Sequence, residues 1–398
     1  MTNLPQGWEV KKLEEIANIK GGKRLPKGKN LLDNNTKFAY IRVADFQDNG
    51  TINLQNIKFI NENTYNVLKN YKIYDDNLYI SIAGTIGKSG IIPKELNGAI
   101  LTENAVKLEY IQNNISNKFM YFFTLSNIFK TQIQTSTKIV AQPKLAITRL
   151  KQIEIPLPPL KEQERIVGIL NESFAKIDES IKILEQDLLN LDELMQSALQ
   201  KAFNPLKDNA KENYKLPQGW EWKSLEEISE NISAGGDKPK NCTESKTAKN
   251  QIPVYANGVN NNGLVGYTDK ATIIKPSLTI SARGTIGFVC IRKEPYFPIV
   301  RLISLIPCEN ILCLHYLYFC LNFFIAKGEG SSIPQLTIPK FKSLQIPLPP
   351  LKEQEQIAEH LDELSSHVKN LKQNYQAQIK DLQELKNSLL DKAFKGNL

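Results

Sequence analysis

A ten-residue segment, IPLPPLKEQE, occurs twice in this chain, at residues 155–164 and again at residues 346–355. An identical decamer does not recur by chance in one chain, so the sequence predicts a duplicated architecture. Its prolines fix φ and are expected to end a strand ladder. The Lys-Glu-Gln-Glu turn that follows favours a helix start, because acidic side chains suit the positive end of the helix dipole. Each copy therefore predicts the end of a globular segment and the beginning of a helix.

Other segments repeat in the same order around the decamer. LPQGWE recurs at residues 4–9 and 216–221, GTIG at 84–87 and 284–287, and KAF at 201–203 and 392–394. The distance between copies falls from 212 residues to 200 and then to 191, and it stays at 191 from the decamer to the end of the following helix. The two predicted helices therefore match residue for residue, whereas the globular segments differ in length.

Each decamer precedes a long amphipathic segment. Apolar residues recur there at spacings of three and four, which is the a/d pattern of a coiled coil. We call this pattern the apolar seam, and it needs a partner, for which the other copy is the obvious candidate. The seam is predicted to comprise Leu170, Phe174, Ile177, Ile181, Leu184, Leu188 and Leu191 in the first helix, and Leu361, Leu364, Val368, Leu371, Tyr375, Ile379 and Leu382 in the second, with a break in phase near Leu382 to Leu385.

The linker between the two copies predicts how the helices pair. A helix of about 40 residues is about 60 Å long, whereas a linker of about twelve residues reaches only about 40 Å. Parallel pairing would require the linker to cross the whole helix length, so antiparallel pairing is expected. The predicted fold is α+β, with two similar globular α/β domains separated by a pair of long antiparallel coiled-coil helices in a pseudo-two-fold internal repeat. The predicted boundaries are 1–155 for the first globular domain, 156–203 for the first helix, 204–215 for the linker, 216–346 for the second globular domain and 347–398 for the second helix.

The charge is distributed unevenly along the chain. Residues 1–150 have a net charge of +8 and residues 216–345 of +4, whereas the helical segments 151–215 and 346–398 have −3 and −1. Basic globular domains suggest a polyanionic partner, although a soluble basic protein without such a partner has the same balance. The first residues contain no apolar signal segment, and the longest apolar run, 313–326, is too short to span a bilayer. We therefore expect a cytoplasmic protein.

Motifs for catalysis or metal binding are not found. The GTIGKS segment at residues 84–89 resembles a phosphate loop, but a Walker A motif needs glycine where Ile82 stands, and the second copy has Phe288 in place of the lysine. Strands that end in a glycine turn are the better interpretation. The five cysteines form no Cys-x-x-Cys pair and are expected to be buried free thiols. We expect no catalytic residue, no metal and no cofactor in this chain.

The remaining candidates for function are basic, polar loops. Glycines allow a backbone to approach closely, and neighbouring Lys and Arg side chains can contact phosphates or guanine edges, although an exposed loop without a ligand has the same composition. The aromatic residues at 120–123 and 316–319 are expected to form the core face of a short helix rather than to stack on bases. The predicted DNA-binding residues are Lys20, Gly21, Gly22, Lys23, Arg24, Lys27, Lys29, Lys88, Lys138, Gln142 and Lys144 in the first copy, and Lys238, Lys240, Arg283 and Gln335 in the second.

With its LPQGW openings, GTIG turns and IPLPPLKEQ segments leading into long helices, the whole chain resembles the specificity subunits of type I restriction–modification systems. The resemblance implies two target recognition domains, each of which reads one half of a bipartite target in double-stranded DNA. It implies that the helices set the gap between the halves and bind two methyltransferase (modification) subunits, with motor–nuclease (restriction) subunits completing the complex.

The resemblance also implies that S-adenosylmethionine, Mg²⁺ and ATP bind only to the partner subunits. It identifies no individual base-reading residue. Two alternatives stay open at this point. A specificity subunit that serves a fused methyltransferase–nuclease would have nearly the same sequence, and a non-enzymatic coiled-coil scaffold would explain the helices but not the two basic domains.

Overall fold

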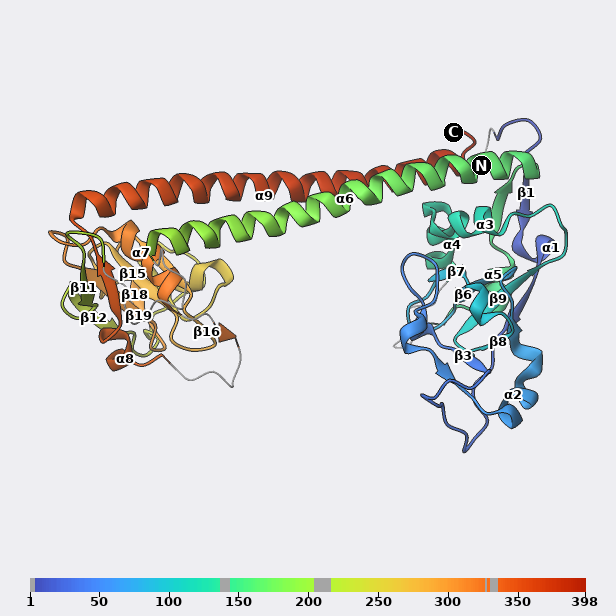
Figure 1. Ribbon diagram of the computed structural model, residues 1–398, viewed down its shortest axis with the longest axis horizontal. Helices are drawn as coiled ribbons and strands as arrows, with labels where there is room; N and C mark the ends of the chain where they lie inside the picture. Colours follow the sequence, from blue (N-terminus) through green and yellow to red (C-terminus); the bar gives the residue numbers. More distant parts are fainter. Residues whose placement is uncertain (1–3, 137–143, 204–215, 326–327, 330–335) are drawn as a thin grey trace. The chain divides into compact units, whose positions relative to one another are not determined.

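The computed structural model describes residues 4–136, 144–203, 216–325, 328–329 and 336–398. The chain forms two compact units, one made of Met1–Leu184 with Ala377–Leu398 and the other of Glu185–Gln376. Each unit contains one globular head and a part of both long helices, α6 (Leu160–Phe203) and α9 (Leu351–Phe394) (Figure 1). Both helices have 44 residues, so the equal helix lengths expected from the repeat are confirmed.

Head 1 is built on a main antiparallel sheet with the strand order β2-β9-β6-β7. A second sheet has the order β4-β3-β8-β5, and β1 pairs with β10 in a two-stranded ribbon. The strands are β1 (Glu9–Lys12), β2 (Ala17–Gly21), β3 (Ala39–Ile41), β4 (Lys58–Phe59), β5 (Lys72–Ile73), β6 (Leu78–Ser81), β7 (Ser89–Ile91), β8 (Ala99–Leu101), β9 (Ala105–Tyr110) and β10 (Glu154–Leu157). The short helices are α1 (Leu13–Ile16), α2 (Glu62–Leu68), α3 (Asn117–Leu125), α4 (Asn127–Ser136) and α5 (Ile147–Lys151).

Head 2 repeats this plan. Its main sheet has the order β12-β19-β15-β17, a second sheet has the order β14-β13-β18, and the pairs β11-β21 and β16-β20 complete the described strands. The strands are β11 (Glu221–Ser224), β12 (Ser229–Ala234), β13 (Ile252–Tyr255), β14 (Leu264–Thr268), β15 (Ser277–Ile280), β16 (Thr285–Ile286), β17 (Val289–Arg292), β18 (Phe297–Pro298), β19 (Ile303–Pro307), β20 (Gly328–Glu329) and β21 (Gln345–Leu348). The short helices are α7 (Leu314–Phe324) and α8 (Ile338–Lys342).

One apolar core in each unit joins the head to both long helices. In head 1, α3 lies between the main sheet and α6 (Figure 1). Its three phenylalanine side chains are buried, as the sequence predicted, whereas Tyr121 is only partly buried. Phe394, near the end of α9, packs on Phe119 with ring centroids 5.1 Å apart. In head 2, Phe203 at the end of α6 packs in the same way on Tyr316 of α7 at 5.4 Å. Each head therefore contacts the beginning of one long helix and the end of the other, so the helices are antiparallel within each unit, as expected.

The copies of LPQGW form matching turns. The amide of Trp8 donates to the carbonyl of Pro5 (3.2 Å), and the amide of Trp220 donates to the carbonyl of Pro217 (3.0 Å). The glycine in each turn has a positive φ, which a residue with a Cβ adopts only with strain. This glycine also lies against the second of the two consecutive prolines of the decamer. The LPQGW turn and the decamer, which are both repeated in the sequence, therefore contact each other in each head.

The decamer differs from its predicted structure in one respect. Pro156 lies inside β10, paired with Val10, and Pro347 lies inside β21, paired with Trp222. The prediction that the prolines of the decamer end a ladder holds for Pro158 and Pro349, because β10 ends at Leu157 and β21 at Leu348. It is wrong for Pro156 and Pro347, because each ribbon has only two described strands and a proline is tolerated where its nitrogen faces the open edge. The helices accordingly begin at Leu160 and Leu351, four residues later than the predicted boundaries at 156 and 347.

The apolar seam includes lysines that the sequence pattern left out. Leu371, which was assigned to the seam, is 40% exposed, and Leu385 is 46% exposed. The neighbouring Lys372 and Lys386 point inward instead, and they form ion pairs with Asp192 and Asp178 of α6. If Lys386 replaces Leu385 as the seam position, the spacings from Leu382 to Lys386 and from Lys386 to Leu389 are four and three residues. The three-four pattern then continues, so the predicted break in phase is absent. The other assigned seam residues are buried or half-buried.

These two ion pairs define the register of the helices. The pair Asp178–Lys386 belongs to the first unit and the pair Asp192–Lys372 to the second. In an antiparallel helix pair, the numbers of facing residues have a constant sum as long as the register is unchanged. This sum is the same for both ion pairs, so both units have the same antiparallel register. A lysine at a core position of a coiled coil favours one register at some cost in stability. The Lys386 ammonium also lies 4.9 Å from the ring centroid of Phe174, which adds an attraction between cation and ring.

A buried glutamine connects head 1 to the start of α6. Gln163, from the decamer, is 1% exposed. Its Nε2 donates to the carbonyls of Pro158 (2.9 Å) and Asn114 (3.1 Å), and its Oε1 accepts from the amide of Ser116 (2.8 Å). The side-chain amide therefore satisfies three main-chain groups at the base of the helix.

Gln354 makes the same three contacts in head 2. Its Nε2 donates to the carbonyls of Pro349 (2.8 Å) and Ile311 (2.9 Å), and its Oε1 accepts from the amide of Cys313 (2.9 Å). We call each of these arrangements a helix–head joint. The sequence showed that these glutamines repeat, but the reason is visible only in the fold, because two of the three partners of each glutamine lie more than 40 residues away in the chain.

Among the described residues, no helix is both long enough and apolar enough to cross a membrane. All five cysteines are free thiols; Cys320 is buried and the other four are half-buried, so the prediction of buried thiols holds for Cys320 alone.

Candidate nucleic-acid interface

The segments predicted to bind nucleic acid meet at one edge of the main sheet in each head. In an antiparallel sheet, the end of one strand and the beginning of its neighbour lie at the same edge. In head 1 this edge is formed by the end of β2, the beginning of β9, the end of β6 and the beginning of β7. In head 2 it is formed in the same way by β12, β19, β15 and β17.

We call this the loop edge. In head 1 it comprises residues 22–29, 83–88 and 102–104, and in head 2 residues 235–240, 281–288 and 299–301. Three chain segments that are distant in the sequence thus form one surface in each head, and they include most of the predicted DNA-binding residues. Lys138, Gln142 and Gln335 lie outside the described residues, and Lys144, at the adjoining bridge to Ala83, is exposed.

Three of the predicted cations of head 1 are paired with carboxylates. Lys20 lies 2.5 Å from Glu109, Arg24 lies 2.6 Å from Glu103, and Lys88 lies 2.8 Å from Asp48. Lys23, Lys27 and Lys29 are exposed, with the ammonium of Lys23 at 5.7 Å from the Tyr71 ring. The basic loop therefore presents less free positive charge than its sequence suggested.

The pKa values of two of these carboxylates, Glu109 and Glu103, are held below their usual value. Burial alone would raise the pKa of Glu109, but hydrogen bonds from Lys107 and Lys20 outweigh it and hold the pKa below its usual value. Burial likewise opposes ionisation of Glu103, whose pKa is held down by hydrogen bonds from Arg24, from its own backbone and from Thr102. Both groups are therefore ionised at neutral pH, and they fix the orientation of the neighbouring cations.

The glycines of the basic loops allow close packing within each head. A Cβ on Gly22 would lie 2.1 Å from the carbonyl oxygen of Thr102, and a Cβ on Gly235 would lie 2.5 Å from the carbonyl carbon of Pro298. These glycines are needed because the loop packs against the chain's own neighbouring turn. The close backbone approach that the sequence suggested is therefore within the protein.

The GTIG segments form turns between β6 and β7 in head 1 and between β15 and β17 in head 2, where Thr285 and Ile286 also form the short strand β16. Gly84, Gly87, Gly284 and Gly287 all have positive φ, and the amide of Gly87 donates to the carbonyl of Ser81 at 2.9 Å. The amide of Gly287 makes the same bond in head 2, at 3.0 Å. The prediction of strands that end in glycine turns is confirmed. These turns place Lys88 and Arg283 at the loop edge, and Arg283 is exposed there.

Head 2 presents further cations at its loop edge. Lys238 and Lys240 follow Gly235 and are exposed. The adjacent turn contains Val300 and Arg301, two exposed residues with left-handed backbone that sequence inspection did not select. A Val-Arg dipeptide gives no turn signal, so the sequence contained nothing that would have identified them.

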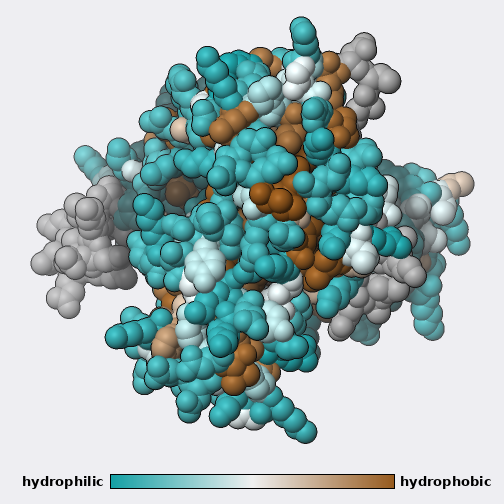
Figure 2. Space-filling model, turned by 90° about the vertical axis from the view of Figure 1, so that its right-hand side faces the viewer, coloured by the Kyte–Doolittle hydropathy of each residue, from teal (hydrophilic) through white to brown (hydrophobic). Residues whose placement is uncertain are grey.

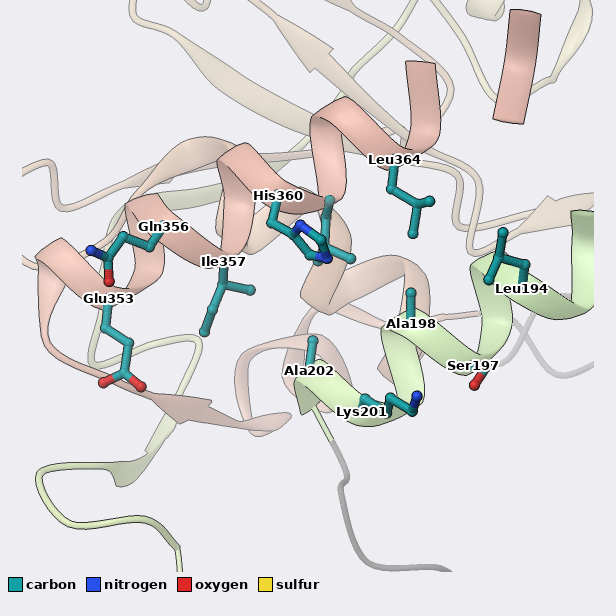
Figure 3. A pocket seen from close by; sticks show the side chains of 11 residues that line it. Leu194, Ser197, Ala198, Lys201, Ala202, Glu353, Gln356, Ile357, His360 and Leu364 are labelled. Atoms are coloured by element: carbon teal, nitrogen blue, oxygen red, sulfur yellow. The ribbon is translucent and has the colours of Figure 1, made fainter. Parts of the chain in front are cut away.

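A second surface lies on the long helices. In the second unit, the end of α6 and the beginning of α9 enclose a groove of about 630 Å³. Figure 3 shows Leu194 and Ala198 of α6 and Ile357 and Leu364 of α9 on its two sides, and most of its lining is apolar. The space-filling view in Figure 2 shows mainly hydrophilic side chains with only small hydrophobic areas on the visible face.

The corresponding helix surface of the first unit is partly covered by the chain itself. Arg165 takes the place that Gln356 has in the groove, and its guanidinium donates to the main-chain oxygen of Leu398 at 2.7 Å. Leu398 also packs against the core of that unit. The repeat therefore leaves the groove open in one unit and partly filled in the other. Within the described residues, no group of three or more His, Cys, Asp or Glu side chains could hold a metal ion.

Comparisons with known proteins agree with this organisation. The family model described as the type I restriction modification DNA specificity domain matches residues 5–188 and again 217–381, once for each copy of the repeat. A putative type I specificity subunit of Mycoplasma pneumoniae is 29% identical over 355 residues, which covers 89% of this chain and 88% of the relative. The specificity subunit of the Escherichia coli type I enzyme EcoBI is 29% identical over 205 residues, covering 50% of this chain and 42% of the relative.

Two solved structures share the fold. A structure from work on complex assembly and conformational transition of the type I R-M system has a TM-score of 0.82 at 21% identity and covers all of both chains. The HsdS subunit from Thermoanaerobacter tengcongensis has a TM-score of 0.64 at 21% identity, covering 100% of this chain and 98% of that one.

Proposed function

The chain belongs to the type I restriction–modification DNA specificity family, and we propose that its two heads each read one half of a bipartite target in double-stranded DNA. The observation that carries this proposal is the loop edge, which is built from the same strand ends in both heads but carries different side chains. Two heads with the same backbone arrangement but different side chains at the loop edge are suited to bind two half-sites of different sequence. The exposed lysines at this edge would contact phosphates, while other side chains read base edges.

We propose that the long helices fix the distance between the half-sites and bind methyltransferase subunits. The apolar groove between α6 and α9 supports this, because a contiguous apolar surface on a soluble helix pair is typical of a docking site. The repeat predicts two such subunits per chain. Since Arg165 and Leu398 partly cover the second surface, the two docking events would differ in affinity. Motor–nuclease subunits would complete a restriction complex.

In this proposal the chain itself is not catalytic and acts in the cytoplasm. S-adenosylmethionine, Mg²⁺ and ATP would bind to the methyltransferase and the motor–nuclease subunits.

Co-expression with the methyltransferase of the same system tests the proposal. The purified complex is incubated with a random DNA library, and the methylated positions are read by sequencing. We expect a target with two specific parts and an unspecified gap, and no methylation by this chain alone. A single continuous target, or methylation without sequence preference, would contradict the proposal that each head reads one half-site.

Native mass spectrometry measures the stoichiometry of the complex. A saturated complex with one methyltransferase per chain would contradict the two-site model.

A further inference from the structure

The turn at Val300 and Arg301 is the most strained part of the loop edge of head 2. Both residues have positive φ, of 52° and 59°. The amide of Leu302 donates to the carbonyl of Ile299 at 3.1 Å, so Val300 and Arg301 are the two central residues of a tight turn. Positive φ at both central positions usually requires Asn or Gly, and it is a true outlier for a β-branched residue such as valine. Valine nevertheless stands here, and it is 50% exposed.

The same turn exists in head 1 without the strain. There the amide of Ala105 donates to the carbonyl of Thr102 at 3.2 Å, with Glu103 and Asn104 as the central residues. The two turns are equivalent, because in each head the residue that follows the turn bonds to a glycine of the basic loop. The amide of Gly22 donates to the carbonyl of Ala105, and the amide of Gly235 donates to the carbonyl of Leu302. Neither Glu103 nor Asn104 has a positive φ. The corresponding position therefore changes from an acidic, relaxed turn to an apolar–basic, strained one.

Hydrogen bonds from two neighbouring loops hold the strained turn. The amides of Val300 and Arg301 donate to the carbonyls of Gly236 and Gly235, both at 2.8 Å. The side chain of Asn257 donates to the carbonyl of Val300 at 2.7 Å. Both amides and one carbonyl of the two central residues are thus used to fix the shape of the turn, while its side chains are left exposed. Strained residues that the surrounding structure holds in place are concentrated at functional sites.

The loop that supplies Asn257 is itself rigidly supported. Asn262, also with positive φ, accepts a hydrogen bond on its carbonyl from the guanidinium of Arg292 at 2.6 Å. Arg292 is 8% exposed and stacks on the ring of Tyr255 at 3.5 Å. The buried Arg292 therefore fixes the loop that contains Asn257 and Asn262. Through Asn257, this loop holds the turn at Val300.

The side chain of Arg301 differs from that of Arg24 in head 1. Arg24 is paired with Glu103, whereas Arg301 has no side-chain hydrogen bond or ion pair with any of the residues that the structure describes. An exposed guanidinium on a rigid turn is suited to bidentate binding of the O6 and N7 atoms of guanine, and an adjacent valine is suited to the methyl group of thymine.

We propose that Val300 and Arg301 are specificity-determining residues of head 2, with Arg301 reading a guanine and Val300 contacting an adjacent thymine methyl group. This inference rests on the proposed function of the heads. The turn acts as a fixed reading tip, and Lys238 and Lys240 at the same edge bind phosphates. Head 1 would read different bases with its own turn.

The test uses the complete complex with the methyltransferase and a random DNA library. Arg301→Lys keeps the charge but loses the bidentate fork, and Arg301→Ala loses both. We expect both variants to lower the preference for guanine at one position of one half-site by about 5- to 150-fold, equivalent to ~1–3 kcal/mol, with the other half-site unchanged. Val300→Ala should relax an adjacent position. Lys240→Ala is the matched control: it should weaken binding to all sequences equally and lower the salt dependence.

Two results would overturn the inference. If Arg301→Lys keeps the full base preference while Arg301→Ala weakens all sequences equally, Arg301 is a phosphate contact. If Arg301→Ala leaves both half-sites and the affinity unchanged, the turn does not touch DNA. Circular dichroism and thermal melting of each variant identify any loss of fold, and Arg301→Lys, which keeps the backbone contacts, is expected to fold. A wild-type complex without a bipartite target would instead contradict the proposed function itself.

Discussion

The helix–head joint in the second unit provides a quantitative test of what holds a head to its helix. Replacing Gln354 by leucine keeps the side-chain size but removes all three hydrogen bonds, to Pro349, Ile311 and Cys313. Each such bond contributes ~1 kcal/mol net, so the loss is about 3 kcal/mol. For a unit of this size, that corresponds to a fall in Tm of about 6–12 °C. Gln356→Leu is the matched control, because Gln356 lies two residues further along α9, on another face of the helix, and is exposed.

Differential scanning calorimetry measures the fall in Tm, and hydrogen exchange shows where the structure has loosened. In the Gln354→Leu variant the amide of Cys313 loses its acceptor, so peptides that contain it should exchange faster than in the control. If Gln354→Leu melts within about 2 °C of the Gln356→Leu control and Cys313 stays protected, the joint does not contribute as argued. Gln163→Leu should reproduce the effect in the first unit.

Three other predictions concern the helices and the basic loop. Lys386→Asp and Asp178→Lys should each lower the Tm, and the double variant should recover part of the loss with a coupling of less than about 1 kcal/mol; an additive double variant would mean that the pair does not set the register. Matched heptad insertions after Leu184 and after Tyr375 should lengthen each helix by about 10 Å and the unspecified gap in the methylated target by about three base pairs, with both half-sites unchanged; an unaltered gap would exclude the helices as the spacer. Lys27→Ala should reduce the salt dependence of DNA binding by about 0.9 in the log–log slope, and an unchanged slope would remove Lys27 from the interface.

The sequence predicted the parts of the fold that depend on repetition and periodicity. The decamer and the three-four spacing identified two equal helices, and the linker length predicted their antiparallel pairing. Helix periodicity is a local property, so it can be recognised in one sequence. It failed where a lysine takes an apolar position: Lys372 and Lys386 point inward because Asp192 and Asp178 lie opposite them, and only the partner helix reveals this.

The candidate interface was predictable in composition but not in detail. The basic loops were located from their Gly and Lys content, yet Arg24 is neutralised by Glu103, a residue 79 positions away in the chain. The turn at Val300 is the opposite case, since its left-handed backbone is imposed by Gly235, Gly236 and Asn257 against the local preference of the valine. Contacts between distant segments determine both the pairing of Arg24 and the backbone conformation of Val300, and such contacts cannot be recognised in a single sequence.

The helix–head joint has a consequence for how such a chain can change over generations. The glutamine binds only main-chain atoms of the head, and the residues that supply them already differ between the two copies: Ser116 corresponds to Cys313, and Asn114 to Ile311. A head can therefore replace its side chains at this position without altering the hydrogen bonds that hold it. Recombination within the identical decamer segments would exchange whole heads between genes and preserve the joint, so new binding specificities could arise by shuffling rather than by gradual substitution.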